Sequence, residues 1–545
     1  MNTEEIKTKI KGEIDTSEET LVKYSRDASI FEVRPEVVVF PKDTDDLKAL
    51  VKWVASQKQN NPELSLTARS AGTDMSGGPL NESIIVDFNK HFNKILEVGR
   101  DYAVTQPGVF YRDFEKETLK HQLLLPCYPA SRELCTVGGM VANNSAGEKT
   151  LVYGQTRNFV ENLKVVLSDG QEYSFGPLTE NEVEAKMRLP NFEGQIYRQM
   201  FQLVKDNYEL IQQARPQTSK NSAGYYLWDV WDKRKFDLTQ VLCGSQGTLG
   251  LVTEIKFRLV KPKPKSRLLV LFLNDLKNLG NIVKTVMEHK PETFESFDDH
   301  TFSLAMRFLP GMLKKMKGNI IKLAWQFLPE VWMTITGGIP KLILIAEFTG
   351  EDEQEILGRV KFTQNQVEQK FRIKTHITKS EAEAQKYWTV RRESFNLLRQ
   401  HVSGKQTAPF IDDIVVRPEQ LPEFLPKLNR ILEQYPSLIY TIAGHAGDAN
   451  FHIIPLMDLS KPSERAIIPK LSETVYSLVM EFNGSITAEH NDGLIRTPYL
   501  EKMYGAEMCR LFAEVKKIFD PHGIFNPRKK VGGDLGYAMA HIKRS

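Results

Sequence analysis

Three glycine-rich stretches in the first half of the chain limit its fold more than any other feature. They read ARSAGTDMSGGPL at 68–80, CTVGGMVANNSAGEKTLVYG at 135–154 and GSQGTLGLVTEIKF at 244–257, and each adjoins a strand-like run. Glycine there permits positive φ and a close approach of the backbone, so that successive N–H groups can point at a phosphate. One such loop could be ordinary turn chemistry, whereas three are better explained by a long phosphorylated cofactor.

The same stretches argue against several common sites. None of them matches the G-x-x-x-x-G-K-[ST] pattern of a P-loop or the G-x-G-x-x-G pattern of a Rossmann dinucleotide turn. The chain also lacks a G-x-S-x-G elbow, which removes the simplest serine hydrolase.

Alternating strand-like and helix-like runs through the first 260 residues predict α/β layers. The run at 43–57, DTDDLKALVKWVASQ, predicts a helix that Thr44 caps, with an apolar face made by Leu47, Leu50, Val51 and Val54. Pro262 and Pro264 then interrupt a strand-like run just before a new apolar strand. We therefore expect two domains, at 1–265 and 266–545.

Bulk composition describes a globular protein and names no partner. Hydrophobic residues make up 41% and charged residues 26% of 545 residues, and a formal net charge of +3 does not argue for nucleic acid. The charged, polar N-terminus does not resemble a secretory signal, so a cytoplasmic location is expected. Four scattered cysteines, without a C-x-x-C pair, indicate reduced thiols and exclude a self-contained iron–sulfur motif.

Two histidines flank a turn-forming run in IYTIAGHAGDANFHIIPL. The flanks of the run are β-branched and aromatic, which predicts strand, tight loop and strand, so His445 and His452 would meet at one end of a hairpin. Two imidazoles there could share a divalent metal ion, or they could be a pair that only makes hydrogen bonds. This segment alone leaves both readings open.

The ordered motifs resemble a known family. PEVVVFPKDTDDL with the three glycine-rich stretches resembles the PCMH-type FAD-binding domain of the vanillyl-alcohol-oxidase superfamily. GHAGDANFH, ITAEHNDGLIRTPYL and IFDPHGIFNPRKKV resemble the C-terminal half of its D-lactate dehydrogenase and glycolate oxidase branch, and the whole resemblance covers about residues 20–535. It implies an α+β fold, with two α/β subdomains that hold FAD, an antiparallel-sheet cap domain and a C-terminal helical segment.

The resemblance also implies an activity: FAD-dependent oxidation of a D-2-hydroxy acid, D-lactate-like or glycolate, to the 2-oxo acid. Glu489 would join His445 and His452 as the third ligand of a divalent metal ion such as zinc, and His490 would be the base. Arg392 would bind the substrate carboxylate, with Arg391 the neighbour that could be confused with it. Electrons would pass to a quinone, a cytochrome or an iron–sulfur partner. The family members with the most similar motifs continue into a cysteine-rich iron–sulfur region that this chain lacks, which is why a separate partner is expected.

Residues of the glycine-rich stretches would bind the flavin, noncovalently because Thr73 stands where some relatives tether FAD through a histidine. Asn526 resembles a residue that closes over the flavin, although it could equally form a turn before Pro527. The full expected set is Arg69, Ser70, Ala71, Gly72, Thr73, Gly77, Gly78, Pro129, Thr136, Gly138, Gly139, Asn143, Ser145, Gly147, Gly244, Gly247, Thr248, Ile255 and Asn526.

The chain departs from the family pattern in places. Ala449 and Asn491 stand where many relatives have glycine, which could reshape the pocket without removing a ligand. Ile411 lies near the position of a lysine that helps 2-hydroxyglutarate members bind a second carboxylate, so its presence argues weakly against a dicarboxylate. The neighbouring Asp412 and Asp413 have the wrong charge for that task and are expected to be structural.

Residues 301–338 interleave apolar side chains with lysines and prolines too closely for a transmembrane span. We interpret them as helices packed on the cap domain, with a face that rests on the inner membrane surface or on a partner as the alternative. Three other functions stay open: a flavin oxidase that uses oxygen, a metallohydrolase, and a redox-inactive binding subunit.

Overall fold

The computed structural model describes residues 3–298, 340–401 and 404–544, without the side chains of 392–401. The described chain forms two compact units. The first contains residues 1–147, 153–262 and 485–545, and the second contains 148–152 and 263–484. This grouping differs from the expected split at 265/266, because the last 61 residues pack within the first unit.

The first unit is built around a four-stranded sheet in the order β1-β2-β4-β3, in which β2, β4 and β3 run parallel. Residues of β2 and β4 alternate between the two faces, as strand geometry requires. Val37, Val39, Ile84 and Val86 pack in a core with helix α3, whereas Val38 and Ile85 pack with helix α2 on the other face. The elements span Glu13–Asp15 (β1), Glu18–Tyr24 (α2), Val37–Phe40 (β2), Thr44–Gln57 (α3), Leu66–Arg69 (β3) and Ile84–Asp87 (β4).

Helix α3 confirms the predicted apolar face, since Leu47, Leu50, Val51 and Val54 are fully buried. The predicted cap at Thr44 is wrong. Asp43 is the N-cap, with extended backbone angles and a carboxylate that accepts from the N–H groups of Asp45 and Asp46. Thr44 is already the first helical residue, so its hydroxyl does not occupy the capping position.

A second sheet of the first unit has five antiparallel strands in the order β5-β6-β11-β7-β8. These strands are Ile95–Val98 (β5), Tyr102–Thr105 (β6), Val160–Val166 (β7), Glu172–Phe175 (β8) and Leu251–Arg258 (β11). The other elements of this unit are Thr3–Lys7 (α1), Tyr111–Lys120 (α4), Val137–Asn143 (α5), Thr156–Phe159 (η1), Pro177–Thr179 (β9), Glu180–Met187 (α7), Phe192–Asp206 (α8), Tyr208–Gln213 (α9), Lys235–Asp237 (β10) and Thr239–Leu242 (α10). The short helix Thr150–Tyr153 (α6) belongs mostly to the second unit.

The C-terminal segment closes the first unit. It forms Gly493–Arg496 (α20), Thr497–Tyr499 (η4), Leu500–Phe519 (α21) and Leu535–Ala540 (α22). Ile524 and Phe525 complete the core under α3, and the N–H of Leu66 donates to the Ile524 carbonyl at 2.8 Å. Buried apolar side chains therefore hold the end of the chain against the N-terminal sheet.

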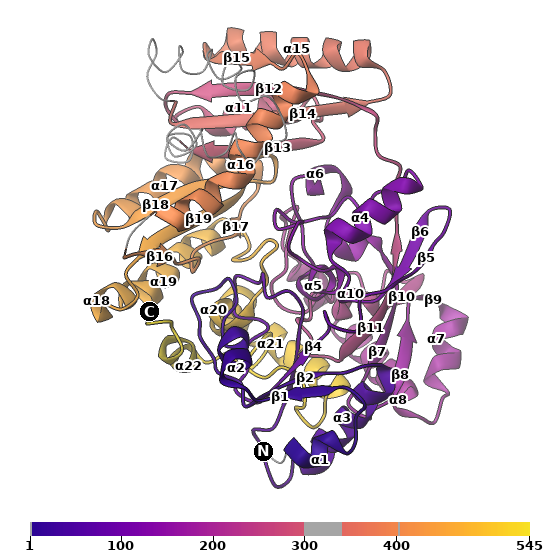
Figure 1. Ribbon diagram of the computed structural model, residues 1–545. Helices are drawn as coiled ribbons and strands as arrows, with labels where there is room; N and C mark the ends of the chain where they lie inside the picture. Colours follow the sequence, from indigo (N-terminus) through magenta and orange to yellow (C-terminus); the bar gives the residue numbers. More distant parts are fainter. Residues whose placement is uncertain (1–2, 299–339, 402–403, 545) are drawn as a thin grey trace. The chain divides into compact units, whose positions relative to one another are not determined.

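The second unit is an eight-stranded antiparallel sheet in the order β15-β12-β14-β13-β18-β19-β16, with β17 also on β19. Figure 1 shows α15 lying along the β12 and β14 end of this sheet. The strands are Lys265–Leu273 (β12), Thr293–Asp298 (β13), Leu342–Gly350 (β14), Lys374–Ile377 (β15), Gln406–Thr407 (β16), Ile414–Val415 (β17), Ile439–His445 (β18) and Asn450–Met457 (β19). The family's antiparallel cap sheet is thus present.

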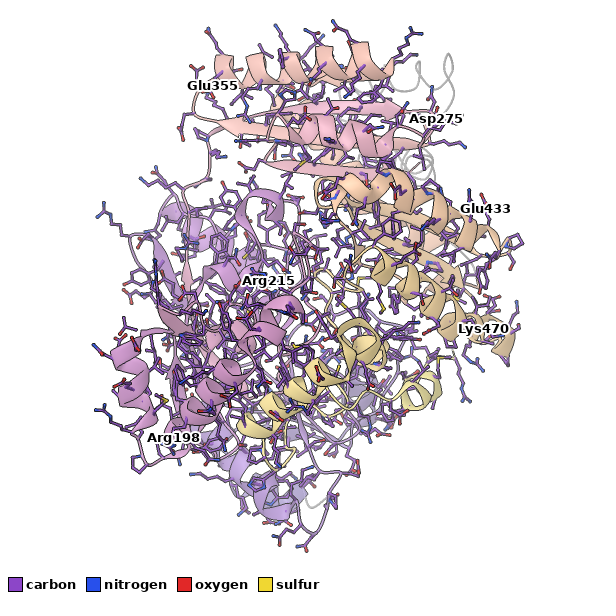
Figure 2. The ribbon with its side chains drawn as sticks, turned by 180° about the vertical axis from the view of Figure 1, so that it is seen from behind. Arg198, Arg215, Asp275, Glu355, Glu433 and Lys470 are labelled. Atoms are coloured by element: carbon purple, nitrogen blue, oxygen red, sulfur yellow. The ribbon has the colours of Figure 1, made fainter. Side chains whose placement is uncertain are left out.

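Helices of the second unit present charged faces to solvent. Figure 2 shows Glu433 of α17 and Lys470 of α19 on the outer sides of their helices, and both are exposed. The helices are Leu279–Met287 (α11), Glu353–Phe371 (α15), Glu381–His401 (α16), Pro418–Gln420 (η2), Leu421–Glu433 (α17), Ala446–Asp448 (η3), Pro462–Arg465 (α18) and Ile467–Glu481 (α19).

Two sequence predictions lie outside this description. The basic amphipathic segment 301–338 falls within residues 299–339, and the side chain of Arg392 is likewise outside the described residues. Among the helices that are described, none is long and apolar enough to cross a membrane.

Candidate functional site

The three glycine-rich stretches meet in the first unit through a network of side-chain amides. Asp74 in the first stretch accepts from Nδ2 of Asn143 in the second at 2.8 Å. Gln246 in the third stretch donates to Oδ1 of Asn143 at 3.3 Å and to the hydroxyl of Ser76 at 3.2 Å. The structure therefore brings together residues that lie 69, 103 and 170 positions apart in the sequence.

Asn526 fastens this network from the C-terminal segment. Its side chain is fully buried and donates to the carbonyls of Gly78 at 3.0 Å and Gln246 at 2.6 Å, and it accepts from the Thr67 hydroxyl at 2.9 Å. Asn491 likewise donates to backbone carbonyls, those of Asn143 at 3.1 Å and Gly244 at 2.9 Å. The glycine loops thus rest on a buried, hydrogen-bonded frame.

The backbone of the loops fits a phosphorylated cofactor. Residues 71–75 are half-buried, and Gly72 has a φ of +70° that a residue with a side chain would rarely adopt. A Cβ on Gly139 would lie 3.1 Å from Oγ of Ser70, which is tighter than ordinary van der Waals contact, so the first and second stretches approach closely at this glycine. These features suit FAD, whose pyrophosphate needs close backbone N–H groups.

Several predicted flavin residues have their side chains engaged within the protein. Arg69 donates to the carbonyls of Tyr24 and Arg26, and burial lowers the pKa of its guanidinium. Thr136 caps α5 by accepting from the Gly139 N–H, and the Thr248 hydroxyl lies 2.6 Å from that of Tyr225. Ile255 is fully buried within β11. These side chains shape the loops, while the backbone remains the part suited to the cofactor.

The other predicted cofactor residues lie in the same three stretches or beside them. Pro129 is half-buried and precedes the second stretch. Ser145 and Gly147 follow α5, where a Cβ on Gly147 would lie 2.0 Å from the Tyr128 carbonyl oxygen. A Cβ on Gly138 would lie 2.3 Å from Cβ of Pro107.

The histidine hairpin in the second unit forms as predicted. Strands β18 and β19 pair with the three-residue turn η3 between them, and the rings of His445 and His452 have centroids 5.3 Å apart. Both imidazoles are well buried, with 4% and 11% of their side-chain surface exposed.

Carboxylates fix both rings. Nδ1 of His445 lies 2.6 Å from Oε1 of Glu295, and Nδ1 of His452 lies 3.0 Å from Oδ1 of Asp412. A protonated Nδ1 that donates to a carboxylate leaves Nε2 as the lone-pair nitrogen, which is the arrangement usual for metal-binding histidines. The donor set therefore fits a divalent metal ion.

Sequence reasoning missed Glu295 and treated Asp412 as structural. Glu295 is 2% exposed on β13 and also accepts from Arg391 at 3.1 Å. Asp413 accepts from Asn450 at 3.1 Å, at the end of the hairpin that carries the turn. An acidic residue at a buried strand position was the signal available for Glu295, since such a residue needs a partner.

Glu489 and His490 belong to the first unit. Glu489 is 6% exposed, with Oε2 3.2 Å from Nζ of the fully buried Lys220 and Oε1 3.9 Å from Nε2 of His490. A buried carboxylate beside an ammonium, as Glu489 is, is chemically suited to a cation.

All four cysteines are free thiols, and three are buried. Burial raises the pKa of Cys127 and of Cys135 to about 12, and that of Cys509 to about 11. These thiols are thus poor nucleophiles and poor metal ligands at neutral pH.

Two family models match the chain. The FAD binding domain matches residues 35–176, and the C-terminal domain of FAD linked oxidases matches residues 262–530. The chain belongs to the FAD-linked oxidase family. Both halves of the recognised architecture are therefore present in the expected order.

This FAD-linked oxidase is 28% identical over 537 residues to D-2-hydroxyglutarate dehydrogenase of Pseudomonas putida, covering 95% of this chain and 50% of that protein. The chain thus spans about half the length of that relative. It is 26% identical to glycolate oxidase subunit GlcD of Bacillus subtilis, covering 95% of this chain and 94% of that protein.

Solved structures show the same fold. The 4-ethylphenol oxidase of Gulosibacter chungangensis matches with a TM-score of 0.68 at 16% identity, covering 96% of this chain and 95% of that one. The PCMH-type fold of this FAD-linked oxidase is therefore shared with enzymes of very different sequence.

Proposed function

We propose that this FAD-linked oxidase oxidises a D-2-hydroxy acid to the 2-oxo acid. The observation that carries the proposal is the pair of carboxylate-held imidazoles, His445 and His452, in a chain that also has the hydrogen-bonded glycine loops of a flavin domain. A 2-hydroxy acid offers a carboxylate and a hydroxyl that can chelate a metal ion together.

The metal ligands in this proposal are His445, His452 and Glu489, with zinc as the favoured ion. Two neutral imidazoles and one carboxylate leave coordination positions open for substrate. Glu295 and Asp412 would keep both imidazoles in the tautomer that binds through Nε2.

In the proposed reaction, Arg392 binds the substrate carboxylate and His490 removes the hydroxyl proton. An imidazole, with an unperturbed pKa of about 6.5, suits a base at neutral pH. Bound FAD would accept the hydride from Cα at N5, while the metal ion would acidify the hydroxyl. The two electrons would leave to a quinone, a cytochrome or an iron–sulfur partner.

The substrate is proposed at the level of its class. Relatives are named for D-2-hydroxyglutarate and for glycolate, and D-lactate belongs to the same chemical class. Ile411 is fully buried and uncharged, so it offers nothing to a second carboxylate. This favours a monocarboxylate.

The test is an anaerobic visible spectrum of the purified protein before and after each of D-lactate, glycolate and D-2-hydroxyglutarate. Bleaching of the flavin band by one of them is expected. A yellow protein that no 2-hydroxy acid bleaches contradicts the proposal, and L-lactate is the control for configuration. Peroxide release measured against dye reduction then separates an oxidase from a dehydrogenase.

A further inference from the structure

Lys220 is a fully buried lysine whose role no sequence motif suggested. It is 0% exposed, and its ammonium lies 3.2 Å from Oε2 of Glu489, which is itself 6% exposed. Burying two charges costs more free energy than a surface pair and is tolerated only with close pairing. The burial of Lys220 therefore needs an explanation.

The backbone on both sides of this pair is fixed. The N–H of Ser222 donates to the Thr487 carbonyl at 3.1 Å, and its hydroxyl donates to the Ala488 carbonyl at 2.8 Å. Gln155 donates to the same Ala488 carbonyl at 3.0 Å and accepts from the N–H of Asn221 at 2.9 Å. The backbone segments that carry Lys220 and Glu489 are therefore joined by hydrogen bonds beside the ion pair.

The two oxygens of Glu489 have different neighbours. Oε2 is taken by Lys220, whereas Oε1 is on the side of His490, at 3.9 Å from Nε2. An ammonium beside one carboxylate oxygen repels a second cation there, so a metal ion is favoured at the other oxygen. Without Lys220, both oxygens could bind the same ion.

We propose that Lys220 is a positioning residue that makes Glu489 a one-oxygen ligand of the divalent metal ion. The inference rests on the proposed function, in which Glu489 is a metal ligand. By withholding Oε2 and placing a positive charge beside the site, Lys220 keeps the ion less tightly held. It thereby leaves a coordination position for the hydroxy acid.

The first experiment compares Lys220→Met with the wild type, both loaded with FAD. The affinity for Zn²⁺ is measured by competition with a chromophoric chelator. The variant is expected to bind Zn²⁺ about tenfold more tightly, because a repelling charge is lost and a second oxygen is freed. Its KM for the reducing hydroxy acid is expected to rise. Unchanged or weaker Zn²⁺ binding overturns the inference.

A matched control is Lys186→Met, which leaves another buried carboxylate, Glu193, without its ammonium. Glu193 is 6% exposed and pairs with Lys186 at 2.5 Å in the first unit. This variant should lose stability but keep wild-type affinity for Zn²⁺. Tighter Zn²⁺ binding by both variants would contradict the specific role of Lys220.

A second measurement needs no variant and does not depend on folding of Lys220→Met. A crystal structure of the wild type with Zn²⁺ should show one Zn–O bond of about 2.0 Å from Glu489, with the other oxygen still on Lys220. Bidentate binding, or Zn²⁺ that avoids Glu489, overturns the inference. Zn²⁺ binding is read without turnover, so a flavin that hydroxy acids fail to bleach would defeat the proposed function alone.

Discussion

The imidazole of His445 at the end of β18 lies 2.6 Å, Nδ1 to Oε1, from the buried carboxylate of Glu295 on the neighbouring strand β13. Arg391 approaches the other oxygen of Glu295 at 3.1 Å, so the carboxylate is held from both sides. The ring is thereby fixed in orientation before any ion binds.

Glu295→Gln should weaken Zn²⁺ binding about 10–100-fold, because an amide holds the ring less strongly and lowers the basicity of Nε2. Asp412→Asn should do the same through His452. The affinity is measured by chelator competition, with flavin content recorded to verify the fold.

The control for both variants is Glu292→Gln. Glu292 is also a buried acid of the second unit, 3% exposed, but it pairs with Lys149 and Lys263. Its loss should lower stability and leave the affinity for Zn²⁺ near that of the wild type. An equal loss of Zn²⁺ binding in all three variants would show that only general stability had been measured.

Asn526→Ala should release FAD and destabilise the first unit. Three buried groups, the carbonyls of Gly78 and Gln246 and the hydroxyl of Thr67, would lose their partner. The expected loss is about 3 kcal/mol in the free energy of unfolding, since each unsatisfied buried group costs about 1–3 kcal/mol. Denaturant unfolding and the recovery of flavin fluorescence measure the two effects.

Asn93→Ala is the matched control, because this amide also donates to two carbonyls, those of Asn89 and Lys90, but is exposed. It should change the free energy of unfolding by less than about 1 kcal/mol. Wild-type flavin retention in Asn526→Ala would show that the hydrogen bonds of Asn526 are not needed to hold the glycine-rich loops in place for FAD.

Gly138→Ala should reduce the flavin content of the purified protein. A Cβ there would lie 2.3 Å from Cβ of Pro107 and 2.6 Å from its carbonyl oxygen, so the second glycine-rich stretch must shift. Gly358→Ala on α15 meets no atom within 4 Å and should stabilise the protein by about 1 kcal/mol, because alanine favours helix. Equal flavin content in Gly138→Ala and the wild type would contradict the close packing.

Asp27 should make the free energy of unfolding fall as the pH rises from about 4 to about 7. Burial and the nearby carboxylate of Asp74 raise the pKa of Asp27 from 3.8 to about 7. The folded state then holds this proton more tightly than the unfolded state, so its contribution is complete below about pH 4 and is lost by about pH 7. Asp27→Asn should remove about 2 kcal/mol of this pH dependence. This is less than the full pKa shift implies, because the side chain of Asp27 is only half-buried.

Lys529 should have the opposite effect from Asp27: it should make the free energy of unfolding rise with pH above neutral. Burial lowers its pKa from 10.5 to about 7, so the free energy of unfolding should rise between about pH 7 and pH 10. Lys529→Met should flatten that limb and leave the acidic limb intact. Urea unfolding at intervals from pH 4 to pH 10 measures both, and identical profiles for the variants and the wild type would contradict these pKa shifts.

Much of the fold follows from local pattern. The buried face of α3, the hairpin around His445 and His452 and the glycine-rich loops beside strands could all be predicted, because each depends on side-chain periodicity or turn chemistry within a few residues. The cap of α3 could not, since Asp43 and Thr44 are both capping residues and only the backbone angles choose between them.

The sequence by itself determined the residue types of the site: the glycine loops, the paired imidazoles and the acid before His490. Only the tertiary structure decided their partners, because Glu295 lies 150 residues from His445, and Lys220 lies 269 residues from Glu489. The tertiary structure also places residues 485–545 in the first unit, where Asn526 and Phe525 are buried. Such contacts depend on burial and on the pairing of charges in a low-dielectric interior, which no local pattern encodes.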